Sequence, residues 1–101
     1  MTPEEQLYLE TGRSTTDAQE SQMFGKPCFK INGKAFVAFF QQCMVFKLTG
    51  DMHAQALAHD GAQLFDPSGK GRAMKEWVQV PYDYKTHWKT YAQAALSYVG
   101  S

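Results

Sequence analysis

The sequence holds only two cysteines, Cys28 and Cys43, among its 101 residues. Two thiols can form one bridge, but they cannot build the dense disulfide framework of a small secreted domain. We therefore expect reduced cysteines packed in or beside a sheet. The sequence also lacks the Cys-x-x-Cys, His-Glu-x-x-His and calcium-loop spacings, so we predict no metal site and no cofactor.

Long hydrophobic runs and a net charge are missing as well. The longest apolar run, Ala35 to Phe40, is far shorter than the ~20 residues that span a bilayer. The N-terminus lacks the basic start and apolar stretch of a signal peptide. These absences predict a cytoplasmic protein that does not bind a membrane. Ten basic and ten acidic residues cancel, which argues against a dedicated nucleic-acid binder.

The charges are nevertheless unevenly distributed along the chain. Residues 1–20 are mainly acidic, residues 21–50 contain lysines and no acid, and residues 70–101 are again basic. We therefore expect a dipolar molecule with an acidic N-terminal arm near a basic sheet.

Apolar residues are plentiful enough for one core, at 44% hydrophobic and 14% aromatic. A chain of this length buries roughly two-thirds of its unfolded surface. We predict one domain over residues 1–101, in which residues 1–22 form a helical or loop arm and residues 23–99 form the core.

Helix signals stand at both ends and in the middle. Thr2 to Glu5 combines an N-cap, a proline at the first helical position and a capping-box glutamate, and Gly12 is expected to end this helix. Asp51 suits the N-cap of a short helix over residues 52–60. A longer helix from about Asp83 to Val99 is indicated by the helical spacing of Tyr84, Trp88, Tyr91, Ala95 and Tyr98. The polar segment 14–22 fits either a loop or a short helical piece.

Runs rich in β-forming residues predict about five strands between these helices. Asn32-Gly33 is a strong hairpin signal because a type I′ turn needs positive φ at both positions; this hairpin would set Phe29 opposite Phe36. The turn at Gln41-Gln42 leaves two registers open. A two-residue turn pairs Phe39 with Met44 on the face opposite Phe36, whereas a bulge aligns Phe36 with Phe46.

The predicted fold class is therefore α+β, with an antiparallel sheet flanked by N-terminal and C-terminal helices in the order α-β-β-β-α-β-β-α. Brief and longer strands are expected at residues 64–65 and 74–80, separated by a type I turn at Asp66 to Gly69.

The loop that follows this turn is the main candidate binding site. Glycines allow backbone N–H groups to approach an anion, and Lys70, Gly71, Arg72 and Lys75 add positive charge, with Lys26 or Lys47 as possible helpers. The spacing is not that of a phosphate-binding P-loop. The alternative is an exposed basic turn without a ligand.

The sequence gives less support to two other functions, catalysis and the stacking of nucleic-acid bases on aromatic residues. A cysteine nucleophile needs a nearby histidine, but His53 and His59 do not share a helix face, and His87 is explained by a local helix pair with Asp83. Ala35 to Phe39 matches the end of an RNA-recognition motif. Lys34 occupies the place of the stacking aromatic residue, so that fold is not expected.

Both faces of the strand over residues 35–40 are apolar, which suggests a homodimer. Phe39, Met44 and Trp88 are the predicted interface residues, because a monomer should not expose so much apolar surface. In the competing account, the N-terminal and C-terminal helices each cover one face.

An ordered set of motifs resembles a known family. Its parts are Met23-Phe24-Gly25, Asn32-Gly33-Lys34 with Phe36, Val45 to Leu48, and Gly71 to Val78 followed by Val80-Pro81. Over about Met23 to Val99 the chain resembles the N-terminal domain of TfoX/Sxy proteins, which is similar in fold to MmcQ/YjbR-like domains.

That resemblance implies an antiparallel sheet flanked by helices and carries over no catalytic residues. The expected function is a non-enzymatic binding or regulatory module that acts in protein–protein or transcription-related regulation. The alternatives are an anion- or nucleic-acid-binding domain that uses the Gly-Lys-Gly-Arg loop, and a small enzyme with a Cys/His site.

Overall fold

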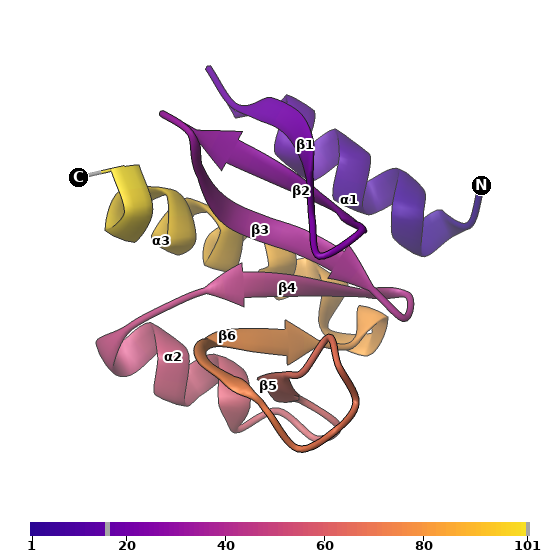
Figure 1. Cartoon of the computed structure of the whole chain (residues 1–101), viewed down its shortest axis with the longest axis vertical. Helices are drawn as coiled ribbons and strands as arrows, with labels where there is room; N and C mark the ends of the chain where they lie inside the picture. Colours follow the sequence, from indigo (N-terminus) through magenta and orange to yellow (C-terminus); the bar gives the residue numbers. More distant parts are fainter. Residues whose placement is uncertain (16, 101) are drawn as a thin grey trace.

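The computed structural model describes residues 1–15 and 17–100, which form three α-helices, one 3₁₀ helix and one six-stranded sheet (Figure 1). Along the chain the elements are α1 (Pro3–Arg13), β1 (Gln19–Met23), β2 (Lys26–Ile31), β3 (Lys34–Phe40), β4 (Cys43–Lys47), α2 (Gly50–Leu57), β5 (Gln63–Phe65), β6 (Met74–Val80), η1 (Tyr82–His87) and α3 (Trp88–Gly100). The α+β class and the antiparallel sheet are confirmed, with one strand more than expected.

The sheet has the strand order β1-β2-β3-β4-β6-β5, and all neighbouring strands are antiparallel. α3 packs against β2, β3 and β4, while α1 contacts β3 and α3, and α2 contacts β6 and α3. In Figure 1, α1 and α3 lie behind the sheet. The described helices therefore share one face, and we call the opposite face, towards the viewer, the open face. The account in which the two terminal helices cover one face each is wrong.

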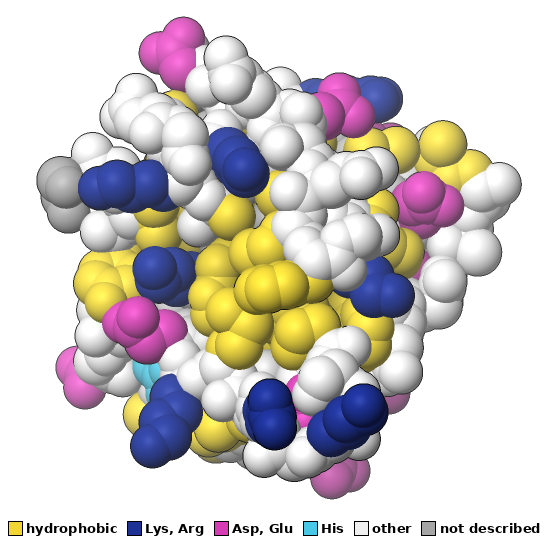
Figure 2. Space-filling model, in the orientation of Figure 1, with side chains coloured by type: hydrophobic (Ala, Val, Ile, Leu, Met, Phe, Trp, Pro, Cys, Tyr) yellow, Lys and Arg dark blue, Asp and Glu magenta, His cyan; other side chains and the backbone are white. Residues whose placement is uncertain are grey.

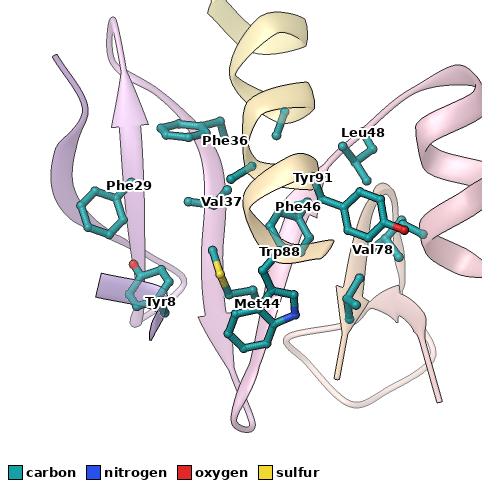
Figure 3. Packing of buried hydrophobic residues seen from close by; sticks show 14 of the residues in the cluster. Tyr8, Phe29, Phe36, Val37, Met44, Phe46, Leu48, Val78, Trp88 and Tyr91 are labelled. Carbon is teal, nitrogen blue, oxygen red and sulfur yellow. The ribbon is translucent and has the colours of Figure 1, made fainter. Parts of the chain in front are cut away.

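The main core lies between the helices and the covered face of the sheet. Strand residues such as Phe29 and Phe46 meet Tyr8 and Tyr91 from the helices (Figure 3). The ring of Tyr8 lies 5.3 Å from that of Phe29, and the ring of Phe46 meets Tyr91 edge-on at 5.7 Å. This aromatic packing fixes α1 and α3 on the sheet.

The predicted homodimer interface is part of this core. Phe39, Met44 and Trp88 are all buried within the main cluster. The helices that cover them belong to the same chain, so these three side chains cannot form a surface for a second copy.

Helix α1 starts as predicted but ends later. The Thr2 hydroxyl accepts a hydrogen bond from the Glu5 N–H at 3.1 Å, and Pro3 occupies the first helical position. The helix continues through Gly12, which was expected to end it, as far as Arg13. Tyr8 is buried in the main core, so α1 contributes to the core that we expected from residues 23–99.

β1 is the strand that the sequence did not predict. Within the segment 14–22, for which a loop or a helical piece was expected, residues from Gln19 onward form an edge strand paired with β2; Thr16 lies outside the described residues. An edge strand can be polar because one of its sides faces solvent. Here Glu20 also forms an ion pair with Arg13 of α1, with 3.1 Å between the charged atoms.

The register across the Asn32-Gly33 turn differs from the prediction. The turn itself is confirmed, with φ of 52° and 79°. Phe29 nevertheless pairs with Val37 rather than Phe36, because the register shifts between Phe29 and Lys30. This bulge turns Phe36 towards the helices together with Val37.

The turn at Gln41-Gln42 follows the simpler of the two registers considered. Both glutamines have positive φ, and Phe39 pairs with Met44. Phe46 pairs with Val37, so the alternative alignment with Phe36 is wrong. Because of the bulge in the preceding hairpin, Phe36 and Phe39 lie on the same face rather than on opposite faces.

The second half of the chain shows two differences at helix starts. α2 begins at Gly50, with Thr49 at the N-cap position but without a side-chain capping bond, so Asp51 lies in the first turn instead of at the N-cap. The C-terminal helix is divided: η1 is a 3₁₀ segment in which Tyr84 departs from helical angles, and regular α-helix begins at Trp88. β5 and β6 lie where the sequence predicted them.

Candidate functional site

The open face carries a second, smaller hydrophobic cluster. Its buried members are Cys28, Ala38, Val45, Phe65 and Trp77, and Met23, Ala35, Phe40 and Met74 pack against it. Side chains of successive strand residues point to opposite faces. In β2, β3, β4 and β6, the residues next in sequence to main-core residues therefore form this cluster. No described helix covers it.

The sheet curls over this face. Phe40 of β3 and Phe65 of β5 have ring centroids 5.2 Å apart in an edge-on contact. β4 and β6 separate these two strands in the sheet, so the contact requires β5 to bend back over the open face. Phe65 also lies 6.4 Å from the ring of Trp77, which anchors the bend.

A groove of about 880 Å³ lies beside this bend. Its volume falls in the range of ligand-binding clefts. Phe40 and Pro27 form part of its apolar lining, and Lys26, Gln63 and Gln79 contribute polar groups. The other lining residues are Phe39, Gln41, Leu64, Asp66, Pro67, Ser68, Gly69 and Ala73. The Lys26 ammonium lies 5.3 Å from the centre of the Phe40 ring, which holds this cation at the wall of the groove.

The loop between β5 and β6 is organised by one carboxylate, that of Asp66. Its Oδ1 accepts the N–H groups of Ser68 and Gly69, each at 3.0 Å. Its Oδ2 accepts the N–H of Gly71 at 2.9 Å and that of Arg72 at 3.1 Å. The backbone can wrap around the carboxylate in this way because Gly69 and Gly71 have positive φ.

The environment of Asp66 favours its charged form. The Ser68 hydroxyl donates a 2.6 Å hydrogen bond to Oδ1 and is the largest cause of the lowered pKa of Asp66, and the backbone N–H groups act in the same direction. The expected turn is present, with the Gly69 N–H bonded to the Asp66 carbonyl at 3.3 Å. The backbone donors that an external anion would need are therefore already bound to a carboxylate of the chain.

The structure brings together only part of the predicted anion site. Lys70, Gly71 and Arg72 lie in the Asp66 loop and are exposed. Lys75 instead lies beside α2, where its carbonyl accepts a 2.8 Å hydrogen bond from Nε2 of His53. Of the two proposed helpers, Lys26 lines the groove, and Lys47 lies opposite Trp77 on the open face.

Positive charge surrounds the hydrophobic centre of the open face. Figure 2 shows a yellow patch there with dark blue lysine and arginine side chains around it, while acidic side chains lie mostly nearer the outline. Strand alternation places Lys30 and Lys47 on this face, in addition to Lys26 at the groove. The open face is therefore an apolar surface with a cationic rim.

The two thiols are poor candidates for a nucleophile. Cys28 is 1% exposed, and burial raises its pKa despite the opposing charge of Lys30. Burial also raises the pKa of Cys43, against a hydrogen bond from Gln79. Both thiols are free, and a raised pKa keeps them protonated, whereas the reactive form is the thiolate.

Two of the histidines form an aromatic cluster on the helix side. The His59 ring stacks on Tyr84 at 4.3 Å, and its Nε2 lies 2.6 Å from the Tyr91 hydroxyl. His87, expected to pair with Asp83, lies with its ring 5.1 Å from that of His59. Burial, and then the neighbouring His87, lower the pKa of His59.

Residues 1–15 and 17–100 contain neither a metal-binding cluster nor a membrane-spanning helix. No cluster of three or more His, Cys, Asp or Glu side chains is arranged there to hold a metal ion. The helices in this part of the chain are too short or too polar to cross a membrane.

Sequence reasoning missed the groove and the role of Asp66. Lys26, Phe40 and Gln79 come from three different strands, so their proximity depends on the curl of the sheet. Asp66 had a signal, because Asp-Pro-Ser-Gly predicts a turn. The turn pattern does not show that the same carboxylate also reaches Gly71 and Arg72.

Comparisons with known proteins give no family assignment. No family model matches the chain, and neither the curated proteins nor the solved structures compared with it show significant similarity.

Proposed function

We propose that this chain is a non-enzymatic binding module, and that its partner is a protein segment that occupies the groove on the open face. The observation that carries the proposal is the difference between the two faces of the sheet. Helices cover one face, while the other keeps a groove of about 880 Å³ beside a hydrophobic cluster. A contiguous apolar surface with a polar rim is typical of a protein-interaction site.

The positive charge of the rim indicates that the partner contains acidic residues. Lys26 lines the groove, and Lys70 and Arg72 project from the loop that forms its other wall. The loop also contains one negative charge, that of the Asp66 carboxylate, which accepts hydrogen bonds from backbone N–H groups; Lys26, Lys70 and Arg72 outnumber it. A partner with acidic residues around an apolar side chain complements this surface.

A nucleic acid fits the same surface less well. Single-stranded nucleic acids are held by bases that stack on exposed aromatic rings. On the open face Trp77 is 5% exposed and Phe65 is fully buried, so neither ring can stack on a base; the rings left for stacking are Phe24 in the turn between β1 and β2 and the half-buried Phe40. The backbone nest that would hold a phosphate is occupied by Asp66.

The non-enzymatic assignment rests on the chemistry of the candidate groups. Cys28 belongs to the open-face cluster and has a raised pKa, whereas His59 and His87 lie against Tyr91 of α3. A nucleophile and its base have to be within hydrogen-bond reach, and this separation supports a binding role.

We further propose that the module is regulatory and acts in the cytoplasm. The sequence motifs that resemble TfoX/Sxy N-terminal domains support a role in protein–protein or transcription-related regulation. Cys28 and Cys43 are not joined in a disulfide, which suits a reducing compartment.

Binding of defined peptides tests the proposed function. The probe is a fluorescein-labelled peptide with one Trp among Asp, Glu and Ser residues, and the measurement is fluorescence anisotropy. We expect Lys26→Glu to weaken binding about tenfold, or about 1.4 kcal/mol. Lys89→Glu is the matched control, because Lys89 is exposed on α3, on the other side of the molecule, and it should bind like the native chain.

Two further probes separate the alternatives. A peptide with Ser in place of Trp should bind more weakly, because the apolar contact is lost. Oligothymidylate should not compete with the peptide. Failure of the native chain to bind the acidic peptide, or equal effects of the two lysine substitutions, would contradict the proposed site.

A further inference from the structure

The turn between β1 and β2 contains a phenylalanine in an unusual conformation. Met23 pairs with Lys26, which leaves Phe24-Gly25 as a two-residue turn with φ of 53° and 74°. Turns of this type favour Asn-Gly because both central residues need positive φ. A bulky residue with positive φ is a rare exception.

The other two-residue turns of the sheet show what this position normally accepts. Asn32 stands at the same place in the next hairpin with φ of 52°, and Gln41 does so in the third with φ of 51°. Both are polar residues that interact well with water at a turn. Phe24 is 64% exposed, so it combines a strained backbone with an apolar ring in solvent.

The position of the turn connects it to the groove. The strands β1 to β4 alternate in direction, so the Phe24-Gly25 turn and the Gln41-Gln42 turn lie at the same end of the sheet (Figure 1). Lys26, two residues after Phe24, lines the groove together with Phe40 and Gln41. Phe24 is therefore an exposed aromatic residue next to the cationic wall of the proposed site.

We infer that Phe24 is the aromatic anchor for the acidic protein segment that occupies the groove. This inference rests on the proposed function and names the residue that determines its affinity. The ring packs on the apolar side chain of the partner, while Lys26, Lys70 and Arg72 face its carboxylates. Aromatic residues carry a large share of the energy of protein contacts, and strained residues gather at binding sites; Phe24 would meet the partner at the edge of the groove, beside Lys26.

The test is Phe24→Asn, which separates folding from binding. Asn is the preferred residue at this turn position, so we expect the melting temperature to stay the same or rise. We expect the affinity for the labelled acidic Trp peptide to fall at least about tenfold. Phe24→Tyr, which keeps the ring, should bind nearly as well as the native chain.

Each other outcome has a defined meaning. If Phe24→Asn binds normally while Lys26→Glu does not, the anchor is wrong and the proposed function stands. If the native chain does not bind the peptide, both are wrong. A lower melting temperature of Phe24→Asn would make Phe24 a packing residue and overturn the inference. Binding of oligothymidylate that depends on Phe24 would also overturn it, because the partner would then be a nucleic acid.

Discussion

Gly12 lies where α1 crosses the sheet, and its missing side chain allows the helix to come close. A Cβ built at this position would overlap the ring of Phe29. Phe29 is buried and lies against Tyr8 from the same helix, so the ring has little freedom to move away. Gly12 therefore allows α1 to pack closely on β2, and it does not mark the end of the helix.

We expect Gly12→Ala to lower the free energy of unfolding by about 2 kcal/mol, because overpacking a filled core is destabilising. This sign is opposite to that of helix propensity, which favours Ala over Gly by about 1 kcal/mol. Urea unfolding followed by circular dichroism measures the difference.

Gly100→Ala is the matched control for this substitution. The nearest atom to a Cβ at Gly100 is a methyl carbon of Ile31 at 3.9 Å, an ordinary contact, so stability should change little. Adding Phe29→Leu to Gly12→Ala should give less destabilisation than the sum of the two single substitutions. Additive effects would show that Gly12 and Phe29 do not interfere.

At the scale of elements, aromatic contacts around His59, which follows α2 in the chain, link the end of α2 to η1 and α3. Its imidazole stacks on Tyr84 of η1 and is hydrogen-bonded to Tyr91 of α3. His87 lies close enough for two positive charges to repel each other. Burial, and then the neighbouring His87, favour neutral His59 and lower the pKa of this group.

This lowered pKa predicts a dependence of stability on pH. The unfolded chain binds a proton at His59 more readily than the folded chain does, so the free energy of unfolding should fall as the pH drops below about 6.5. Above that pH the contribution of neutral His59 is fully present. Urea unfolding at a series of pH values should show a shallower decline for His59→Gln than for the native chain, and identical slopes would contradict the prediction.

The elements also show why part of the fold was predictable. Asn32-Gly33 and the alternating apolar residues of β3, β4 and β6 carry local signals, because turn type and burial depend on the residues themselves. β1 has no such signal: Gln19 to Gln22 is polar, and its pairing depends on the neighbouring strand β2. The bulge at Phe29 and Lys30 is decided by packing of Phe36 and Val37 under α3, which a local pattern does not contain.

The candidate site was less predictable for the same reason. The positive charge of Lys70 and Arg72 was visible in the sequence, but their relation to Lys26 required the curl of β5 towards β3. The expected interface residues Phe39, Met44 and Trp88 were recognised as large apolar groups. Their assignment to the core instead of a dimer interface depends on where three helices lie.

At the scale of the whole molecule, one group of acidic residues and one group of lysines lie on opposite sides of the sheet. The acidic residues Glu4 and Glu5 begin α1, which packs on the covered face, while the lysines of β2 and β4 lie on the open face. The acidic start of α1, expected near the basic sheet, therefore lies on the other side of the sheet from these lysines. An acidic partner is attracted to the open face by this arrangement, and the attraction weakens as salt screens it.

The same arrangement opposes pairing of two copies through their open faces. A symmetric dimer brings the same surface of both subunits together, so Lys26, Lys47 and Arg72 of one copy would meet those of the other. Asp66, whose carboxylate binds the backbone of its own loop, keeps its negative charge and offsets only part of the positive charge of these three side chains. We therefore expect a monomer of 11.4 kDa in sedimentation velocity at low ionic strength over a range of concentrations. A dimer at low salt would contradict this expectation.

Association that increases only when salt is added would have a different cause. It would show that the hydrophobic patch attracts a second copy once salt screens the repulsion between the lysines. Lys26→Glu is the control for this case, because a chain with less positive charge on this face should begin to associate at a lower salt concentration.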